Sequence, residues 1–144
     1  SVGGHLSGRA LLQVRHVAGD FGVREGFYSE DLRSVGALFF GARWTPERPW
    51  SVRAGFAHHH EVPKAVLLDQ PGASVLGTAE GIRHRSGAEI GGGYHLPIDK
   101  IWQPGRLGAQ FEAAAAWIPD DSGPRLYGFV DVLLTVDVGP SLSR

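Results

Sequence analysis

The sequence predicts an all-β fold, an antiparallel up-and-down (meander) β-barrel with six clear strands and room for eight, in a single domain over residues 1–144. Along six segments, apolar and polar residues alternate with a period of two, which is the pattern of strands with unlike faces. The chain carries 21 glycines, which suit a tightly curved sheet. It has no run near the roughly 20 apolar residues that a membrane-spanning helix needs.

Composition excludes several functions. A net charge of −1 provides no basic field, so we expect no nucleic-acid partner. The absence of cysteine excludes disulfide bonds, thiolate metal sites and cysteine nucleophiles. The chain begins without methionine or an apolar leader, which indicates either that a signal peptide has been removed or that the chain is part of a longer one.

The first two strands are predicted at residues 5–17 and 35–45. In the first, Leu12 and Val14 lie on the face opposite Arg9. The second is apolar on both faces around Phe39 and Phe40, so its orientation stays open at this point.

The third and fourth strands, residues 50–61 and 82–96, are a matched pair with one apolar face and one charged face each. The apolar residues are Trp50, Val52, Ala54 and Phe56 in the third strand and Ile82, Ala88, Ile90, Tyr94 and Leu96 in the fourth. If these faces meet lipid, the protein is an outer-membrane barrel; if they meet a core, it is a soluble β-protein.

The fifth and sixth strands are predicted at residues 106–118 and 126–138. The four alanines at 113–116 favour helix by propensity, but the flanking alternation and Pro119 favour a strand. The sixth strand has the cleanest alternation in the chain. We expect Val130, Val132, Leu134 and Val136 to face lipid, and Asp131, Thr135 and Asp137 to face the interior.

The connections differ in length, as in outer-membrane meanders. Two are long, at 18–34 and 62–81, whereas the turns at 46–49 and 97–105 are shorter. The long connections leave room for short further strands, at residues 21–28 or 65–68. The short-turn rim carries Trp44, Trp50 and Trp102. Tryptophan prefers membrane interfaces, so these residues indicate an aromatic girdle. The alternative is that they pack the ends of a soluble core.

Five short motifs lie between residues 50 and 96. They are VRAGFA at 52–57, EVP at 61–63, DQP at 69–71, RH at 83–84 and GGGY at 91–94. Together they resemble the late strands of the long-chain fatty-acid transporter family of outer-membrane barrels. The resemblance covers about a third of the chain and implies a membrane barrel through which a hydrophobic solute passes.

The charged residues on the polar faces are candidates for the barrel interior or for ligand binding. They are Arg53, His59, Glu61, Arg83, Arg85, Glu89, Glu112 and Asp131, with Arg9, Arg15, Arg43 and Asp137 sharing their parity. Inside a small barrel they would form a paired network, because buried charges persist only when paired and hydrogen-bonded. We expect Glu61 and Arg53 to be the nearest partners for the charges of the fourth strand. In a soluble barrel the same residues would be a solvated outer face.

The run of three histidines and a glutamate at 58–61 raises the question of a metal site. His58 and His60 share one face of the strand. A hairpin whose paired residue numbers sum to about 144 places His60 opposite His84, and Glu61 opposite Arg83. Two imidazoles leave a zinc or nickel site open, and the sequence shows no third ligand. We therefore expect a histidine cluster at the loop-side rim, with no metal and no cofactor.

A catalytic interpretation has little support. His84 and Ser86 share a face and could act as the base and nucleophile of a lipid hydrolase. Glu89 has the opposite parity and is badly placed to orient His84. We therefore expect no catalytic residue, and an outer-membrane lipid hydrolase stays an alternative only.

The sequence thus favours a small bacterial outer-membrane barrel that acts as a passive channel or a scaffold. Its expected partners are membrane lipid, a hydrophobic small molecule, and either further copies or another chain that completes the barrel. The alternative is a soluble, lipocalin-like barrel or sandwich that binds an apolar ligand in the periplasm or outside the cell.

Overall fold

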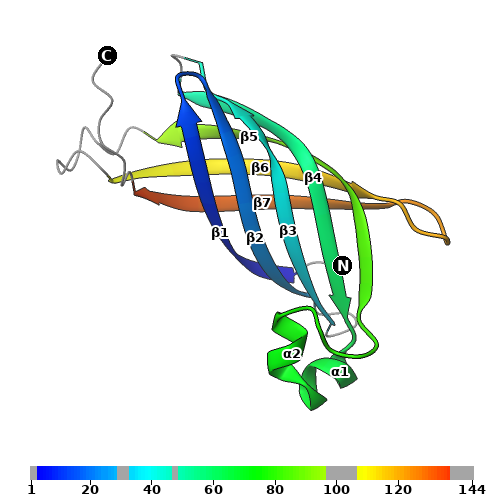
Figure 1. The fold of residues 1–144 in the computed structure, drawn as a ribbon. Coiled ribbons are helices and arrows are strands. Elements are labelled where there is room, and N and C mark those ends of the chain that lie inside the picture. Colours follow the sequence, from blue (N-terminus) through cyan, green and yellow to red (C-terminus); the bar gives the residue numbers. More distant parts are fainter. Residues whose placement is uncertain (1–2, 29–32, 47–48, 97–106, 137–144) are drawn as a thin grey trace.

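The computed structural model describes residues 3–28, 33–46, 49–96 and 107–136. Seven strands form one nearly closed, barrel-shaped sheet in which each strand is antiparallel to the next (Figure 1). The strands are β1 (Gly3–Val14), β2 (Val17–Tyr28), β3 (Arg33–Trp44), β4 (Trp50–Val62), β5 (Arg83–Leu96), β6 (Leu107–Ile118) and β7 (Arg125–Val136). Two short helices, α1 (Lys64–Asp69) and α2 (Pro71–Val75), lie in the β4–β5 connection. The predicted fold class, an antiparallel up-and-down barrel, is confirmed.

Among the described residues, no helix is long and apolar enough to cross a membrane.

Of the two short further strands considered within the long connections, the first belongs to a full strand, β2, whereas residues 65–68 lie in helix α1 instead. The expected long connection 18–34 contains a complete strand that pairs with β1 along its whole length, from Gly3↔Tyr28 to Val14↔Val17. The hairpin turns within two residues, and Arg15 there has a φ of 55°. Arginine is uncommon in this left-handed region. Glycine or asparagine usually marks a tight hairpin, and this turn has neither residue.

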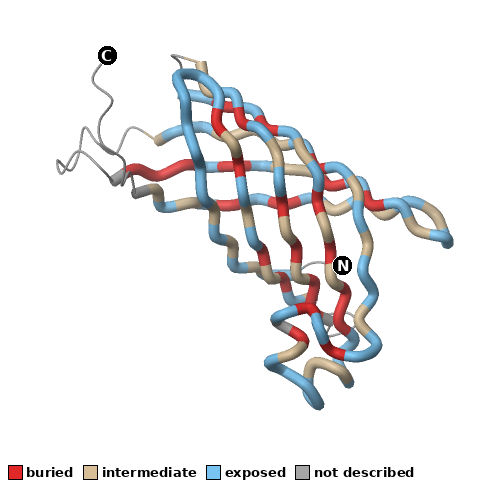
Figure 2. Tube along the Cα trace, in the orientation of Figure 1, coloured by how far each residue is buried: buried red, intermediate tan, exposed pale blue. Residues whose placement is uncertain are grey.

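The two faces of the sheet have opposite character, and burial alternates along the strands (Figure 2). On β7, Val132 and Leu134 are 73% and 83% exposed, whereas Asp131 is 6% exposed. The apolar residues therefore face outward and the charged residues inward, as predicted for the described part of this strand. The side chain of Val136 and the whole of Asp137 lie outside the described residues.

The orientation of β3 follows the same rule. Phe39 is 4% exposed and points inward, whereas Phe40 is 47% exposed and points outward. The ring of Phe39 packs over Gly41 and Gly55, which face each other across β3 and β4. A Cβ at either glycine would overlap the facing backbone and this ring. Both positions therefore require glycine if the two strands and the inward phenyl ring are to keep their spacing.

Among the described residues, no ladder joins the edge strands β1 and β7 to close the barrel. The order runs from β1 to β7 without a β7–β1 pairing. In an antiparallel meander of seven strands, the first and last run parallel, so they cannot continue the antiparallel pattern. Side chains nevertheless cross the seam, because Asp131 lies 2.7 Å from His5 Nε2 and accepts a hydrogen bond from Ser7 at 2.8 Å. An opening of about 400 Å³ lies along the seam.

The sheet also divides at the loop-side rim. The β5–β6 ladder begins only at Ala88↔Trp117, so residues 83–87 of β5 are paired with β4 alone. Figure 1 shows the β6–β7 hairpin extending away from the ends of β4 and β5 at this point. The short segment of β5 is therefore a further free edge of the described sheet, in addition to β1 and β7.

Candidate functional site

The centre of the barrel interior is an ion-pair network organised around Glu112 of β6. Its carboxylate accepts hydrogen bonds from three guanidinium groups. They belong to Arg9 of β1 at 2.8 Å, Arg43 of β3 at 2.7 Å and Arg53 of β4 at 2.6 Å. Glu112 is 0% exposed. A carboxylate without access to water needs such donors, because an unpaired buried charge is very costly.

Three further carboxylates extend this network. Glu89 accepts from Arg53 and, at 3.3 Å, from both terminal nitrogens of Arg24. Asp20 accepts from Arg43 at 2.9 Å and from Arg9 at 3.3 Å. Asp131 Oδ2 lies 3.9 Å from Arg24 Nη2. Among the described residues of this network, four arginines thus face four carboxylates.

Aromatic rings complete the surroundings of two of these arginines. The guanidinium carbon of Arg24 lies 3.6 Å from the centroid of Phe129, and that of Arg53 lies 4.5 Å from the centroid of Phe39. The negative faces of these rings attract the cations where water is excluded. Near Phe129 the interior becomes apolar, with Ala57, Ala116 and Ile118 packed against it.

The structure brings four of the eight predicted candidate residues together in this network. Arg53, Glu89, Glu112 and Asp131 are members of the network, and the predicted Arg53–Glu89 pair is present. From the sequence, Asp20 and Arg24 have no predicted interior role, because the pattern indicates at most a short strand at residues 21–28 and not the full strand β2. The alternation of Asp20 and Arg24 with Phe21 and Val23 was the available signal. Arg15, expected on the same face, lies exposed in the β1–β2 turn.

Two more of the predicted residues, Glu61 and Arg85, belong to a second polar cluster at the loop-side rim. Glu61 accepts hydrogen bonds from Arg125 at 3.1 Å and from the hydroxyl of Tyr127 at 2.7 Å. Arg85 lies 3.8 Å from Glu61, as predicted for this pair, and also donates to Asp120. Arg83 is exposed. It lines an open cavity of about 680 Å³ between the end of β5 and the β6–β7 turn.

His59 lies inside the barrel but outside both ion-pair clusters. It is buried, and its ring centroid lies 5.0 Å from that of Tyr127. Neither ring nitrogen has a hydrogen-bond partner among the described residues. His59 thus lies on the inward-facing side of β4, and its use as a ligand-binding residue stays a prediction.

The carboxylate of Asp120, in the β6–β7 turn, should stay ionised at a lower pH than an ordinary aspartate. A hydrogen bond from Ser122 and the charge of Arg85 lower its pKa from 3.8 to about 2. Because the folded pKa is depressed, the contribution of Asp120 to stability is fully present above pH 3.8 and is lost as the pH falls through about 2. A carboxyl NMR titration should show this value, and Ser122→Ala should raise it. Thr78→Ala, in a distant loop, is the control. Titration of Asp120 near 3.8 in the unaltered protein would contradict the prediction.

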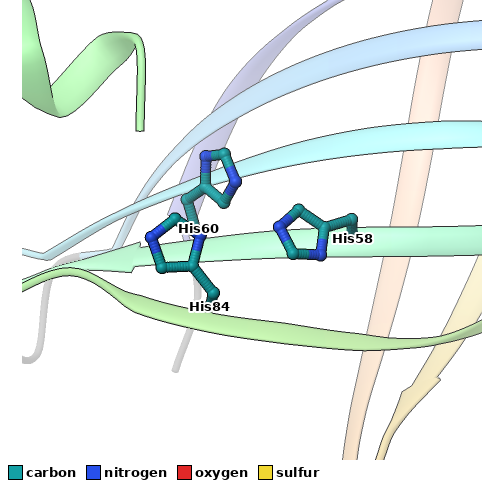
Figure 3. Close-up of side chains that lie close together, drawn as sticks. All are labelled: His58, His60 and His84. Atoms are coloured by element: carbon teal, nitrogen blue, oxygen red, sulfur yellow. The ribbon is translucent and has the colours of Figure 1, made fainter. Parts of the chain in front are cut away.

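The histidines of β4 lie at the loop-side end of the strand, as predicted. The register is the expected one, with His60 opposite His84 and Glu61 opposite Arg83. The expectation that only two imidazoles meet is wrong, because His58 joins them on the outer face (Figure 3). Two residues from His84 along β5, the hydroxyl of Ser86 is hydrogen-bonded to His58 at 2.7 Å.

These contacts leave the hypothetical hydrolase triad unassembled. Ser86 contacts His58, and Glu89 points into the interior, where Arg24 and Arg53 bind it. His84 and Ser86 therefore have no orienting carboxylate from Glu89.

Comparison of the chain with protein-family models, with curated proteins and with solved structures finds no match. The resemblance to fatty-acid transporters stays a prediction from the sequence.

Proposed function

We propose that this chain is a small outer-membrane β-barrel protein with a scaffold role. In this proposal, lipid surrounds the outward face, and paired charges close the interior. The observation that carries this proposal is the distribution of side chains, which is the inverse of that in a soluble protein. Large apolar side chains cover the outside of the barrel, and arginine and carboxylate side chains fill the inside.

The outward face has the composition that lipid requires. Exposed apolar side chains occur on all seven strands; among them are Leu6, Val23, Phe40, Phe56, Ile90, Phe111 and Val132. A soluble monomer rarely exposes a contiguous apolar surface of more than a few hundred Å². At the turn rim, the rings of Trp44 and Trp50 meet edge to face at 5.1 Å, and both are exposed. Exposed tryptophans at one rim support a membrane interface there.

The structure of the interior favours a scaffold role rather than an open channel. Arg53 and Glu112 join β4 to β6 across the barrel, and neither side chain has exposed surface. Ion pairs from Arg9 and Arg43 to the same carboxylate draw β1 and β3 into one layer. Passage of a hydrophobic solute is not part of the proposal, because three arginines and a buried carboxylate cross the interior in this layer.

The soluble alternative meets a physical objection. A lipocalin-like barrel that binds an apolar ligand places apolar side chains inside and polar ones in water. Here Asp20, Arg43 and Glu112 are buried inside, and Leu12 and Leu134 are exposed outside. The soluble form would have to hide most of its outer surface in some other way.

Membrane insertion requires closure of the β1–β7 seam. Unpaired backbone N–H and C=O groups are not tolerated against lipid, so spanning sheets close on themselves. Bacterial single-chain barrels have an even number of strands, starting at eight. We therefore propose that one further strand, antiparallel to both β1 and β7, completes the barrel. A further segment of the same protein or another copy would supply it.

Refolding from urea tests the proposal. The protein should fold into lipid vesicles and detergent micelles, with β-sheet circular dichroism and protection from protease, and should aggregate in plain buffer. In planar bilayers it should give no stable open-channel conductance. A folded, soluble monomer without detergent would overturn the membrane location, and a large stable conductance would overturn the closed interior.

A further inference from the structure

Three histidines gather on the outer face of the barrel at the loop-side rim. His58 and His60 come from β4, and His84 comes from β5 (Figure 3). The ring centroids of His60 and His84 are 4.6 Å apart, those of His58 and His60 are 4.7 Å apart, and those of His58 and His84 are 5.7 Å apart. The three imidazoles thus form a triangle on one patch of the sheet.

The register of the sheet creates this triangle. His60 and His84 are directly opposite residues in the β4–β5 ladder. His58 is two residues from His60, so it points to the same face, and its own partner is Ser86. His84 is therefore the diagonal neighbour of His58, within reach of a long side chain.

The spacing suits a metal ion. One ring nitrogen from each histidine lies within 4.8 Å of the other two. Zinc bound at about 2.0–2.1 Å in tetrahedral geometry places its ligand nitrogens about 3.3 Å apart. Rotation of these partly exposed rings about their side-chain bonds can supply the difference. Three imidazoles also match the preference of zinc, copper and nickel for nitrogen ligands.

Two neighbours hold the imidazoles in place. His58 Nδ1 is hydrogen-bonded to the hydroxyl of Ser86, which leaves Nε2 to point toward His60 and His84 (Figure 3). A ligating histidine almost always uses its second nitrogen for such a bond. On the other side, the backbone of Gly77 lies against the ring of His60, where a Cβ would overlap the imidazole.

We propose that His58, His60 and His84 form a binding site for Zn²⁺ or a similar borderline divalent ion. Three neutral imidazoles hold the ion, and the fourth coordination position is open to water or another oxygen ligand. The bound ion joins β5 to β4 at residues 83–87, the segment of β5 that lacks a β6 partner. The site depends only on the β4–β5 hairpin, so it does not require the proposed membrane location.

Calorimetry with Zn²⁺ on the purified, folded protein is the test. We expect one ion per chain with a Kd of about 1 μM or tighter. His84→Ala should weaken binding by about 100-fold or more, and Ser86→Ala by about tenfold, because a supporting hydrogen bond is worth about 10–100-fold in affinity. His16→Ala, in the turn at the other rim, is the matched control and should bind zinc as the unaltered protein does.

Two readouts on the unaltered protein keep the proposal falsifiable if a variant does not fold. Co²⁺ should give the visible absorption of a tetrahedral nitrogen site, and zinc should slow hydrogen exchange at the amides of residues 83–87. Absence of zinc binding below about 100 μM, roughly −5 kcal/mol, would overturn the site. Equal binding by His84→Ala and the unaltered protein, or equal losses in His84→Ala and His16→Ala, would also overturn it.

Discussion

Replacing Glu112 by glutamine should destabilise the folded barrel by about 3–5 kcal/mol, the range for breaking a buried ion pair from one side. The amide is nearly the same size as the carboxylate, so the packing volume is kept while the negative charge is lost. In the folded protein the carboxylate of Glu112 is an ion-pair partner of Arg9, Arg43 and Arg53. Loss of its charge would leave these three arginines with fewer carboxylates than they need for charge balance.

The measurement is equilibrium unfolding by urea in the micelles or vesicles that keep the protein folded. Glu80→Gln is the matched control, because Glu80 is exposed in the α2–β5 connection. The control should shift the free energy of unfolding by less than about 0.5 kcal/mol. Similar shifts in the free energy of unfolding for the two variants would contradict the prediction. They would mean that water reaches the network and solvates the arginines that lose their partner in Glu112→Gln.

The sequence was sufficient to predict which way most side chains point. A period of two assigns each residue to a face, and a slip of one residue would move every charge to the apolar side. This constraint is why the β4–β5 register, with His60 opposite His84, could be predicted without a structure. The same constraint led to the predicted pairing of Arg53 with Glu89.

The sequence concealed β2 for a physical reason. Its inward positions are occupied by Ala18, Asp20, Gly22, Arg24 and Gly26. Glycine and aspartate are depleted in strands, so local propensity indicates a loop. Pairing on both sides and the ion pairs of Asp20 and Arg24 compensate for this low propensity. These interactions come from distant parts of the chain and cannot be read from a local window.

The third histidine of the rim cluster was missed for a different reason. Residues directly opposite each other in the hairpin are the first candidates for contact, and this relationship pairs His60 with His84 alone. His58 is opposite Ser86 and reaches His84 only along the diagonal. Diagonal neighbours in a twisted sheet approach closely enough for aromatic rings to meet. A sequence search for metal sites in strands therefore needs both relationships.

Val132→Arg should block insertion of the barrel into lipid. The Val132 side chain is 73% exposed on the outer face of β7. In a membrane barrel an arginine on the lipid face costs about 2–4 kcal/mol near the middle of the bilayer. Thr135→Arg is the matched variant on the same strand, because Thr135 points inward and belongs to the polar face. Refolding into vesicles, followed by protease protection, should fall strongly for Val132→Arg and only mildly for Thr135→Arg.

This pair of variants separates the two environments that the outer face could have. If water surrounds the barrel, an arginine at 132 stays solvated and costs almost nothing, because exposed surface substitutions usually change stability by less than about 0.5 kcal/mol. Position 135 would then be the more sensitive one, since it lies beside the packed interior. A larger loss at 135 than at 132 would therefore refute lipid contact on β7. The opposite order would support it directly, because only a medium without water penalises a charge on an otherwise exposed valine position.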